Sequence, residues 1–327
     1  MKANSSDVKR MYEKYPYPST QVGNNLIYDL AGIFGLVIDK KYFEGGKVLD
    51  LGCGTGHRII GLAEQFPDCT FVGVDMSTPS LEIAKQLAAE NEVENVTFLC
   101  SSIEDIPFEN EFDFITSTGV FHHMEDTNSG FKKSYRALKN DGVALIWLYH
   151  IIGEYQRLVD RELVQLLARS EGDEEYFLNV DLMNKLNKSL SEWQYGSATT
   201  QHSDSNFDKL IIDTDAYLHP IVNAYAFHEI EKMFLDSGFS NAFMAGLNKA
   251  GDSKIINLSE KESLRHTLKG EDLFNNDPDI MRRFNSLPYQ AKARAIELCW
   301  KPTGISCLGL KSEASRDKLT NLFRDLK

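Results

Sequence analysis

The chain has 327 residues, of which 42% are apolar and 11% aromatic, and its formal net charge is −13. This acidic balance repels phosphate backbones, and no basic run offers a local face, so a nucleic-acid partner is not expected. The polar N-terminus lacks an apolar signal core, and no apolar run reaches about 18 residues, so neither secretion nor a membrane partner is expected.

Cysteine usage bears on the compartment and on metal chemistry. The five cysteines, Cys53, Cys69, Cys100, Cys299 and Cys307, show no metal-ligand spacing. The first three lie in or beside predicted buried strands, where a thiol behaves as a small apolar side chain. We therefore expect buried free thiols, no metal, and a reducing, cytoplasmic location.

Residues 1–46 are predicted to form an N-terminal arm. Its first part is polar and contains an aromatic group, Tyr12, Tyr15 and Tyr17, together with two prolines. Because prolines fix the backbone, we expect a stiff, extended segment. This segment either closes as a lid over a ligand or packs on the side of the domain. A helix is predicted near 27–34, before a glycine pair at 45–46.

The stretch Val48–Gly56 predicts a ligand site. Its apolar start is typical of a buried parallel strand, and three alternating glycines follow. Glycines at a strand end allow a tight turn and the close approach of a ligand. Apolar residues then recur with helical spacing from Ile59 to Phe66. Strand, glycine turn and helix in this order form a nucleotide-type site at the carboxyl end of the strand.

The glycine spacing narrows the ligand. A dinucleotide fingerprint has the spacing G-x-G-x-x-G, whereas Gly52, Gly54 and Gly56 give G-x-G-x-G. The second predicted strand ends at Asp75, whose carboxylate is able to accept hydrogen bonds from both hydroxyls of a ribose. A ribose held in this way, without a phosphate cradle, favours the adenosine of S-adenosylmethionine over NAD.

This stretch resembles the first motif of the class I S-adenosylmethionine-dependent methyltransferases, and Asp75 matches their ribose-binding acidic residue. The resemblance implies S-adenosyl-L-methionine as cofactor, with contacts from Asp50, Gly52, Cys53, Gly54 and Gly56. The Tyr-Pro-Tyr-Pro leader resembles that of methyltransferases in which the leader approaches the cofactor. That similarity implies cofactor contacts from Tyr15 and Tyr17.

Strand and helix patterns alternate over residues 47–150, the predicted cofactor-binding core. Strands are predicted near 48–51, 70–75, 96–100, 112–117 and 143–148, with a turn at Asn140–Gly142. Ser77 or Thr78 is predicted to cap the helix after the second strand. This alternation predicts an α/β fold with a parallel sheet and helices on both faces. The family resemblance implies a Rossmann-like sheet of seven strands, mostly parallel, with the last one antiparallel.

Ligands of such sheets bind beyond the carboxyl ends of the strands, which singles out further residues. Met76 follows the second strand and is expected to pack either on the adenine ring or in the core. The segment after the third strand resembles the family's adenine-binding segment. This resemblance implies contacts from Ser102, which stands where the family usually has Asp, and from the backbone N–H of Ile103.

The residues after the fourth strand resemble the fourth family motif, which implies that Thr118 and Gly119 lie along the methionine part of the cofactor. His122 and His123 follow. Adjacent side chains point to different sides, so at most one of the two faces the transferred methyl group as a general base. A structural role for the pair is the alternative. At the end of the fifth strand, where a substrate would lie, His150 is a further candidate base.

The pattern changes after residue 150. Residues 151–216 are predicted to form a helical insertion, and 217–327 the remainder of the core with the last two strands. A second helical insertion interrupts this remainder at about 248–304. Insertions beside a cofactor site commonly cover it and shape the substrate pocket. A polar and aromatic cluster that includes Asp215 precedes the resumed core. In it, His219 is either another candidate base or a surface histidine.

These patterns predict a methyltransferase that acts on O or N of a small-molecule acceptor. The acidic surface and the large insertions favour an enclosed small molecule over nucleic acid. A protein or peptide methyltransferase, a non-catalytic S-adenosylmethionine-binding partner protein and an NAD-dependent oxidoreductase stay open as alternatives. The oligomeric state is also open, with a homodimer among the options.

Overall fold

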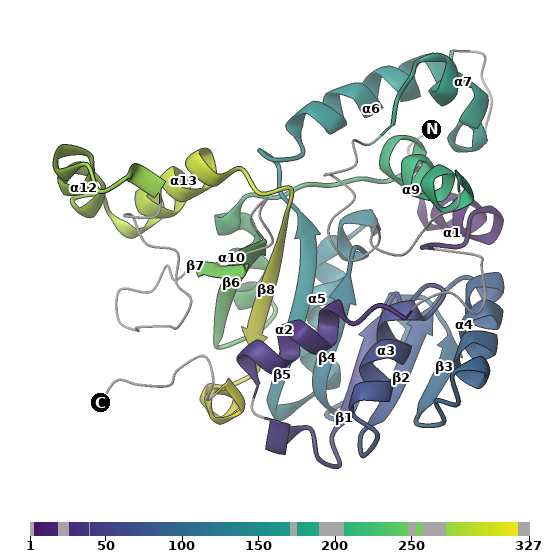
Figure 1. Ribbon diagram of the computed structural model, residues 1–327, viewed down its shortest axis with the longest axis horizontal. Coiled ribbons are helices and arrows are strands. Elements are labelled where there is room, and N and C mark those ends of the chain that lie inside the picture. The colour runs from purple at the N-terminus through teal and green to yellow at the C-terminus, as the bar shows by residue number, and fades with distance from the viewer. Residues whose placement is uncertain are drawn as a thin grey trace.

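One mixed sheet of eight strands forms the centre of the structure, a computed structural model that describes residues 3–18, 26–38, 40–170, 175–189, 206–247, 253–256 and 273–319. The strand order is β3-β2-β1-β4-β5-β8-β6-β7 (Figure 1). The seven strands expected from the sequence are all present. The α/β, Rossmann-like class with helices on both faces is confirmed.

Five strands make the parallel half of the sheet. They are β1 (Lys47–Leu51), β2 (Thr70–Asp75), β3 (Val96–Cys100), β4 (Phe112–Thr118) and β5 (Leu138–Tyr149). The order runs outward from β1 in one direction and from β4 in the other. The crevice beyond the carboxyl ends of β1 and β4 is therefore the topological switch point, where such sheets bind ligands.

The remaining strands are antiparallel to their neighbours. β8 (Gly304–Leu310) lies between β5 and β6 (Asn241–Leu247), and β7 (Ser253–Ile256) pairs with β6 at the edge. β7 is an eighth strand within the second insertion, which the sequence predicts as helical. With two apolar residues in a polar stretch, it carries too little alternation to be recognised as a strand.

β5 begins at Leu138, five residues before the start that the sequence predicts. The pairing shifts between Phe112 and Phe114 of β4, so the expected turn at Asn140–Gly142 is absorbed as an irregularity within the strand. The segment after β8 binds the freed carbonyls. Lys311 N–H donates to the Gly142 carbonyl at 3.1 Å, and Ser312 Oγ donates to the Asn140 carbonyl at 2.7 Å.

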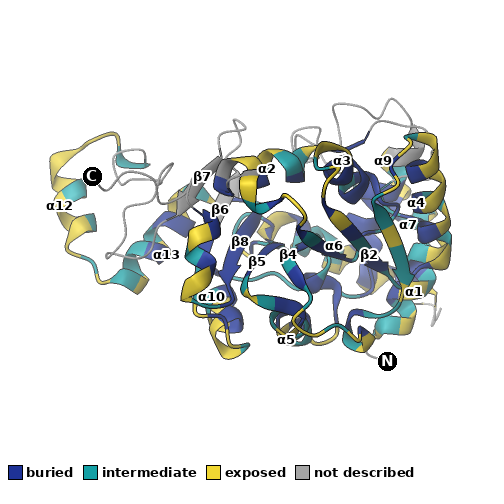
Figure 2. Cartoon of the chain, turned by 90° about the horizontal axis from the view of Figure 1, so that it is seen from below, coloured by how far each residue is buried: buried dark blue, intermediate teal, exposed yellow. Residues whose placement is uncertain are grey.

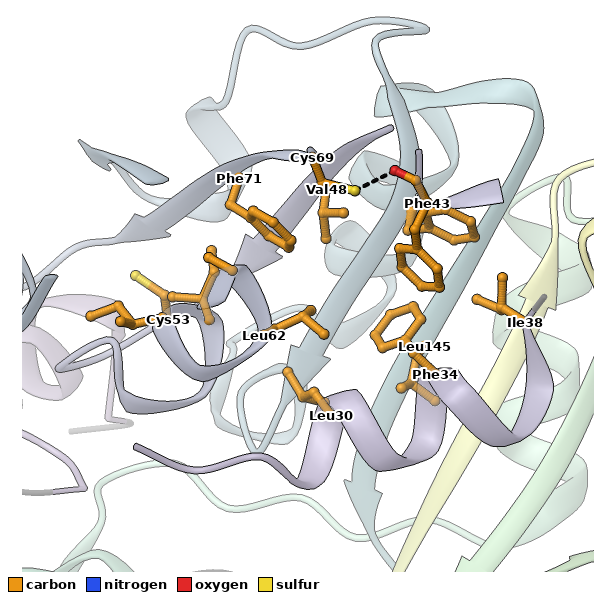
Figure 3. Packing of buried hydrophobic residues seen from close by; sticks show 14 of the residues in the cluster. Leu30, Phe34, Ile38, Phe43, Val48, Cys53, Leu62, Cys69, Phe71 and Leu145 are labelled. Atoms are coloured by element: carbon orange, nitrogen blue, oxygen red, sulfur yellow. Dashed lines mark hydrogen bonds between the residues drawn. The ribbon is translucent and has the colours of Figure 1, made fainter. Parts of the chain in front are cut away.

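Alternate residues of each central strand face two different cores. Val48 and Leu145 pack into one cluster, which Figure 3 shows with Phe34 and Leu62 from the helices of that face. Leu49 and Ile146, their chain neighbours, pack into the cluster on the opposite face. This two-sided burial explains why the parallel strands read as continuous apolar runs.

Helices cover both faces of the sheet. The first face carries α2 (Asp29–Val37), α3 (His57–Gln65) and α4 (Thr78–Glu90), and the second carries α5 (Thr127–Ala137) and α10 (Phe227–Asp236). Ser77 caps α4 as predicted, since its side chain accepts a hydrogen bond from Ser80 N–H. Short 3-10 turns in the described residues include η1 (Lys40–Tyr42), η2 (Ile103–Asp105), η3 (Phe121–His123), η4 (Tyr176–Leu178) and η6 (Glu313–Leu319).

The N-terminal arm is partly helical, contrary to the extended segment that the sequence predicts. Asn4 and Asp7 form a capping box that starts α1 (Ser5–Lys14). The helix ends before Pro16, because the residue preceding a proline disfavours helical backbone. Tyr12 therefore lies on a helix, and residues 15–18 that follow it are not helical.

The insertions add two helical groups. The first contains α6 (Tyr155–Ala168), α7 (Val180–Lys185) and α9 (Asn206–Leu218), and the second contains α12 (Pro278–Asn285) and α13 (Tyr289–Trp300). In Figure 1, α1, α6 and α9 gather beyond the arrowheads of the parallel strands. α12 lies at the periphery with no buried residue (Figure 2).

The structure also bears on two further expectations, that the cysteines are buried free thiols and that no segment crosses a membrane. Cys53, Cys69 and Cys307 are buried as free thiols. Cys100 is exposed, contrary to the expectation, because β3 is the edge strand of the sheet. Among the described helices, none combines the length and the apolar character that crossing a bilayer requires.

Candidate active site

A pocket lies at the switch point of the sheet, beyond the ends of β1, β2 and β4 and beneath the N-terminal arm. It spans about 1020 Å³ of space that no protein atom fills, part of it open to solvent. Most residues predicted to bind the cofactor line it, namely Tyr17, Asp50, Gly52, Cys53, Gly54, Asp75, Met76, Ile103, Thr118 and Gly119. Three predicted residues do not line it: Tyr15, Gly56 and Ser102.

The glycine loop after β1 has the backbone that only glycine adopts without strain. Gly52 and Gly54 have φ of +80° and +54°. A Cβ on Gly52 would lie 2.4 Å from Val120 Cγ2, and one on Gly54 would lie 2.4 Å from the Tyr17 carbonyl oxygen. At Gly54, the group that approaches the loop closely is thus the Tyr17 carbonyl of the arm. Gly56 instead packs α3 against α4.

Asp75 holds the loop and faces the pocket at the same time. Its Oδ2 accepts a hydrogen bond from Gly54 N–H at 2.9 Å, and its Oδ1 accepts one from Ser77 N–H at 2.8 Å. A carboxylate offers about four lone-pair positions, so two are left for hydroxyls of a ligand. Burial raises the pKa of Asp75, although these backbone hydrogen bonds act in the opposite direction.

Asp50 places a second carboxyl group in the pocket wall. It is 4% exposed, and burial raises its pKa to about 7. Arg58, which also lines the pocket and binds Asp29 at 2.9 Å, acts against this rise. A cationic ligand here would favour the ionised carboxylate, since opposite charges attract strongly in a buried site.

The segment after β3 lines the pocket, but with the neighbours of Ser102 and not with Ser102 itself. Ser102 Oγ turns away and donates to Asp105 Oδ2 at 2.8 Å. Ser101 and Glu104, which sequence reasoning did not select, line the pocket beside Ile103. The alternation of side chains along an extended backbone separates Ser101 from Ser102, but the sequence does not show which of the two faces inward.

Several hydrogen bonds attach the arm to the segments around the pocket. Thr55 N–H donates to the Tyr17 carbonyl at 3.0 Å, and Ser77 Oγ donates to the Tyr12 carbonyl at 3.3 Å. At its other end, Ser5 Oγ donates to Glu125 at 2.9 Å. Tyr12 lines the pocket from α1. Tyr15 packs instead against a separate apolar cluster with Phe177.

The structure distinguishes the candidate bases by their position. His123 lines the pocket, whereas His122 and His150 do not. His122 is buried and stacks on Tyr149 with ring centres 3.9 Å apart. Burial lowers the pKa of His122 well below its ordinary value. It is therefore a neutral packing residue at physiological pH.

Both ring nitrogens of His150 face acceptors within the protein. Its Nδ1 lies 3.1 Å from the Pro302 carbonyl, and its Nε2 lies 3.0 Å from Glu297 Oε1. His150 is fully buried and does not line the pocket. This arrangement suits a side chain that holds β5 to α13, not a group that removes a proton from a pocket ligand.

A polar cluster joins the arm, the loop after β4 and the insertion. Tyr12 Oη donates to Asp215 Oδ1 at 2.8 Å, and Asp215 Oδ2 lies 3.9 Å from His123 Nε2. His219 stacks on His123 with ring centres 3.7 Å apart. Asp215 and His219 come from the cluster that the sequence places before the resumed core, whereas the contact with Tyr12 carries no sequence signal.

The same cluster groups three metal-ligand types, His123, Asp215 and His219, with ligand atoms within 4.8 Å of one another. Ile221 N–H donates to His219 Nδ1 at 3.1 Å, so the hydrogen of the neutral ring is on Nε2. Because a nitrogen that carries hydrogen does not ligate, this arrangement does not present His219 as a metal ligand.

Comparison with known proteins identifies the core. Residues 43–188 match the family model described as "Methyltransferase domain". The "Uncharacterized methyltransferase YcgJ" of Bacillus subtilis is 31% identical over 53% of this chain and 64% of its own. A "Malonyl-(acyl-carrier protein) O-methyltransferase" of Priestia megaterium is 27% identical over 44% of this chain and 49% of its own. The chain thus matches less than two thirds of the length of either relative.

A solved structure agrees on the fold. "PKMT2 from Rickettsia typhi in complex with AdoHcy" superposes with a TM-score of 0.56 at 18% identity, covering 90% of this chain and 55% of that one. The glycine loop, the carboxylate at the end of β2 and the pocket at the switch point fit an adenosyl ligand. Residues 43–188 therefore match a methyltransferase domain, and the fold of the chain is that of a protein solved with AdoHcy.

Proposed function

We propose that this protein transfers a methyl group from S-adenosylmethionine to an oxygen or nitrogen atom of a small-molecule acceptor. The observation that carries the proposal is the pocket itself, which Gly52 and Asp75 line from the strand ends, Tyr12 from α1 and His123 from η3. The first two residues suit an adenosyl group, and the last two suit a polar acceptor.

On this proposal, Asp75 binds the ribose hydroxyls through its two remaining lone-pair positions. Ser101 and Ile103 lie along the adenine, and Thr118 and Gly119 lie along the methionine part. When bound, the cofactor supplies an electrophilic methyl group on a positively charged sulfur. Alignment of that methyl group with the acceptor supplies much of the rate of such a displacement.

The arm favours a small acceptor over a protein. α1 covers the pocket and is fixed by Glu125 at one end and by the Tyr17–Thr55 hydrogen bond at the other. An acceptor that reaches the cofactor must fit beneath this helix. A folded protein would need the arm to open, whereas a small molecule enters through the part of the pocket that is open to solvent.

The test combines binding with transfer. Calorimetry is expected to detect binding of S-adenosylhomocysteine and none of NAD. With cofactor labelled in its methyl group and a cell extract, we expect the label in the small-molecule fraction. Label in protein would support a protein methyltransferase instead. Binding without any transfer would support a non-catalytic cofactor-binding protein, and NAD binding would support an oxidoreductase.

A further inference from the structure

Asp215 is a buried carboxylate that is connected to the pocket through one hydroxyl group. It comes from α9, is 7% exposed, and does not itself line the pocket. Tyr12 lines the pocket, and its Oη donates to Asp215 Oδ1 at 2.8 Å. The Tyr12 oxygen keeps a lone pair that is able to accept a second hydrogen bond from a pocket ligand.

The surroundings of Asp215 keep it available as an anion. The titratable groups that face it are Tyr12 and Tyr17 from the arm, His123 from η3, Tyr149 from β5, Arg157 and Arg161 from α6, and His219. Burial raises the pKa of Asp215 to about 6, while Tyr12 and the two guanidinium groups act to lower it. The carboxylate is therefore largely ionised at neutral pH and still basic enough to take a proton.

The neighbouring histidines are weaker bases than Asp215. Burial lowers the pKa of His123 to about 3 and that of His219 well below its ordinary value. His123 Nδ1 lies 2.7 Å from the Ile221 carbonyl, which fixes the ring with its lone pair on Nε2, 3.9 Å from Asp215. A proton that leaves the pocket is thus more stable on Asp215 than on either ring.

We infer that Tyr12 and Asp215 form a relay that removes the acceptor's proton, so that the protein serves acceptors whose nucleophilic atom carries hydrogen. This inference rests on the proposed function and assigns the class of its acceptor, a hydroxyl group or a protonated nitrogen. Acceptors that arrive ionised, such as carboxylates and thiolates, need no such relay and would be repelled by the carboxylate.

The step is balanced in atoms and charge. The acceptor's proton moves to Tyr12 Oη, and the Tyr12 proton moves to Asp215 Oδ1. The electron pair that the departing proton leaves on the acceptor atom forms the new bond to the methyl carbon, as the carbon–sulfur bond breaks and its electron pair stays on sulfur. A positive sulfur and a negative carboxylate become a neutral thioether and a neutral acid, which a buried site favours over separated charges.

The experiment uses Asp215→Asn, because asparagine keeps an acceptor for the Tyr12 hydroxyl but does not take a proton. Tyr12→Phe removes the relay itself. Asp213→Asn is the matched control, since Asp213 lies on the same helix but binds Ser189 and Lys209. All variants are first tested for S-adenosylhomocysteine affinity, which Asp215→Asn and Asp213→Asn are expected to leave within about twofold.

The acceptors are a ring-matched series of phenol, benzylamine, thiophenol and benzoate, together with the small-molecule fraction of an extract. Methyl transfer to proton-bearing acceptors is expected to rise with pH through about 6 in the parent protein. Asp215→Asn is expected to lower kcat by about 10²–10⁴-fold, with KM little changed. It is also expected to abolish the rise of the rate with pH. Asp50, a carboxyl group of the pocket whose pKa burial raises to about 7, is unchanged in that variant, so a lost rise of the rate with pH belongs to Asp215.

A second readout needs no turnover. In carbon-13 spectra of the cofactor-free protein, one aspartate is expected to titrate near pH 6 and to be missing in Asp215→Asn. Its pKa should rise in Tyr12→Phe, because the Tyr12 hydrogen bond lowers it. Transfer with unchanged kcat and pH dependence in Asp215→Asn, or transfer only to thiophenol or benzoate, would overturn the relay while leaving the proposed function in place. Cofactor binding without any transfer would remove both.

Discussion

His150 and Glu297 form a buried hydrogen-bonded pair, with Nε2 and Oε1 3.0 Å apart, that ties the end of β5 to α13. Phe227 N–H also donates to this Oε1, at 2.6 Å, so three elements meet at one carboxylate. Removing His150 leaves the buried carboxylate with one hydrogen bond fewer. We expect His150→Ala to lower the free energy of unfolding by about 1.5–3 kcal/mol, the value of a hydrogen bond to a charged group.

Urea unfolding would measure this loss, and calorimetry should show S-adenosylhomocysteine affinity within about twofold of the parent. Burial by itself raises the pKa of Glu297, but the hydrogen bonds from His150, Phe227 and Arg294 bring it below its ordinary value. A folded-state pKa below the unfolded one gives stability that is present above the ordinary value and is lost in acid. The cost of His150→Ala should therefore shrink as the pH falls through that range. A loss of cofactor affinity without a loss of stability would argue for a role in the pocket.

Asp75→Ala should weaken S-adenosylhomocysteine binding by about 1.5–3 kcal/mol, the value of hydrogen bonds to a charged group. The substitution also removes the acceptor of Gly54 N–H and Ser77 N–H. Asp75→Asn retains an acceptor but lacks the charge, so it separates the two effects. Isothermal calorimetry measures both variants, and full affinity in Asp75→Ala would contradict the placement of the ribose.

Gly54→Ala should detach the arm from the loop. Its Cβ would lie 2.4 Å from the Tyr17 carbonyl oxygen, which is closer than atoms approach without a shift. We expect faster proteolysis within residues 3–18 and weaker cofactor binding. Gly45→Ala is the matched control, because Gly45 also has a positive φ, of +69°, yet a Cβ there meets nothing within 4 Å. Equal proteolysis of the two variants would show that backbone strain alone explains the effect.

Asp50 should release a proton when the cationic cofactor binds near pH 7. Burial raises the pKa of Asp50 to about 7 in the cofactor-free protein, and a positive sulfur nearby favours the ionised form and lowers that pKa. Calorimetry in buffers of different ionisation enthalpy should report proton release on binding S-adenosylmethionine. Neutral S-adenosylhomocysteine should release less. Identical values for the two ligands, or unchanged release in Asp50→Asn, would refute the assignment.

The cofactor side of the pocket was accessible to sequence reasoning because its signals are local. The apolar run, the glycine loop and the helix that follows occupy consecutive residues, and Asp75 ends the next predicted strand. Periodicity and turn chemistry report on such neighbours directly. The core strands are therefore confirmed to within a few residues, except at the start of β5, where contacts from the segment after β8 replace a turn.

The other side of the pocket depends on contacts between distant segments. Tyr12 meets Asp215 across 203 positions, and His150 meets Glu297 across 147 positions. Neither pair leaves a periodic pattern, because each side chain is chosen by the tertiary packing around it. The sequence accordingly selected His150 from its place at a strand end, although an acidic partner from the second insertion occupies it.

Because Asp215 lies on α9, evolutionary selection can act on this residue independently of the residues of the core. The glycine loop and Asp75 belong to the alternating core, whereas Asp215 belongs to an insertion. If the relay acts as we propose, mutation of that helix changes the nucleophile that is served while every residue of the glycine loop is kept. Homologues with an identical loop are free to diverge in the compounds they modify, and residues 206–218 are the better guide to that divergence.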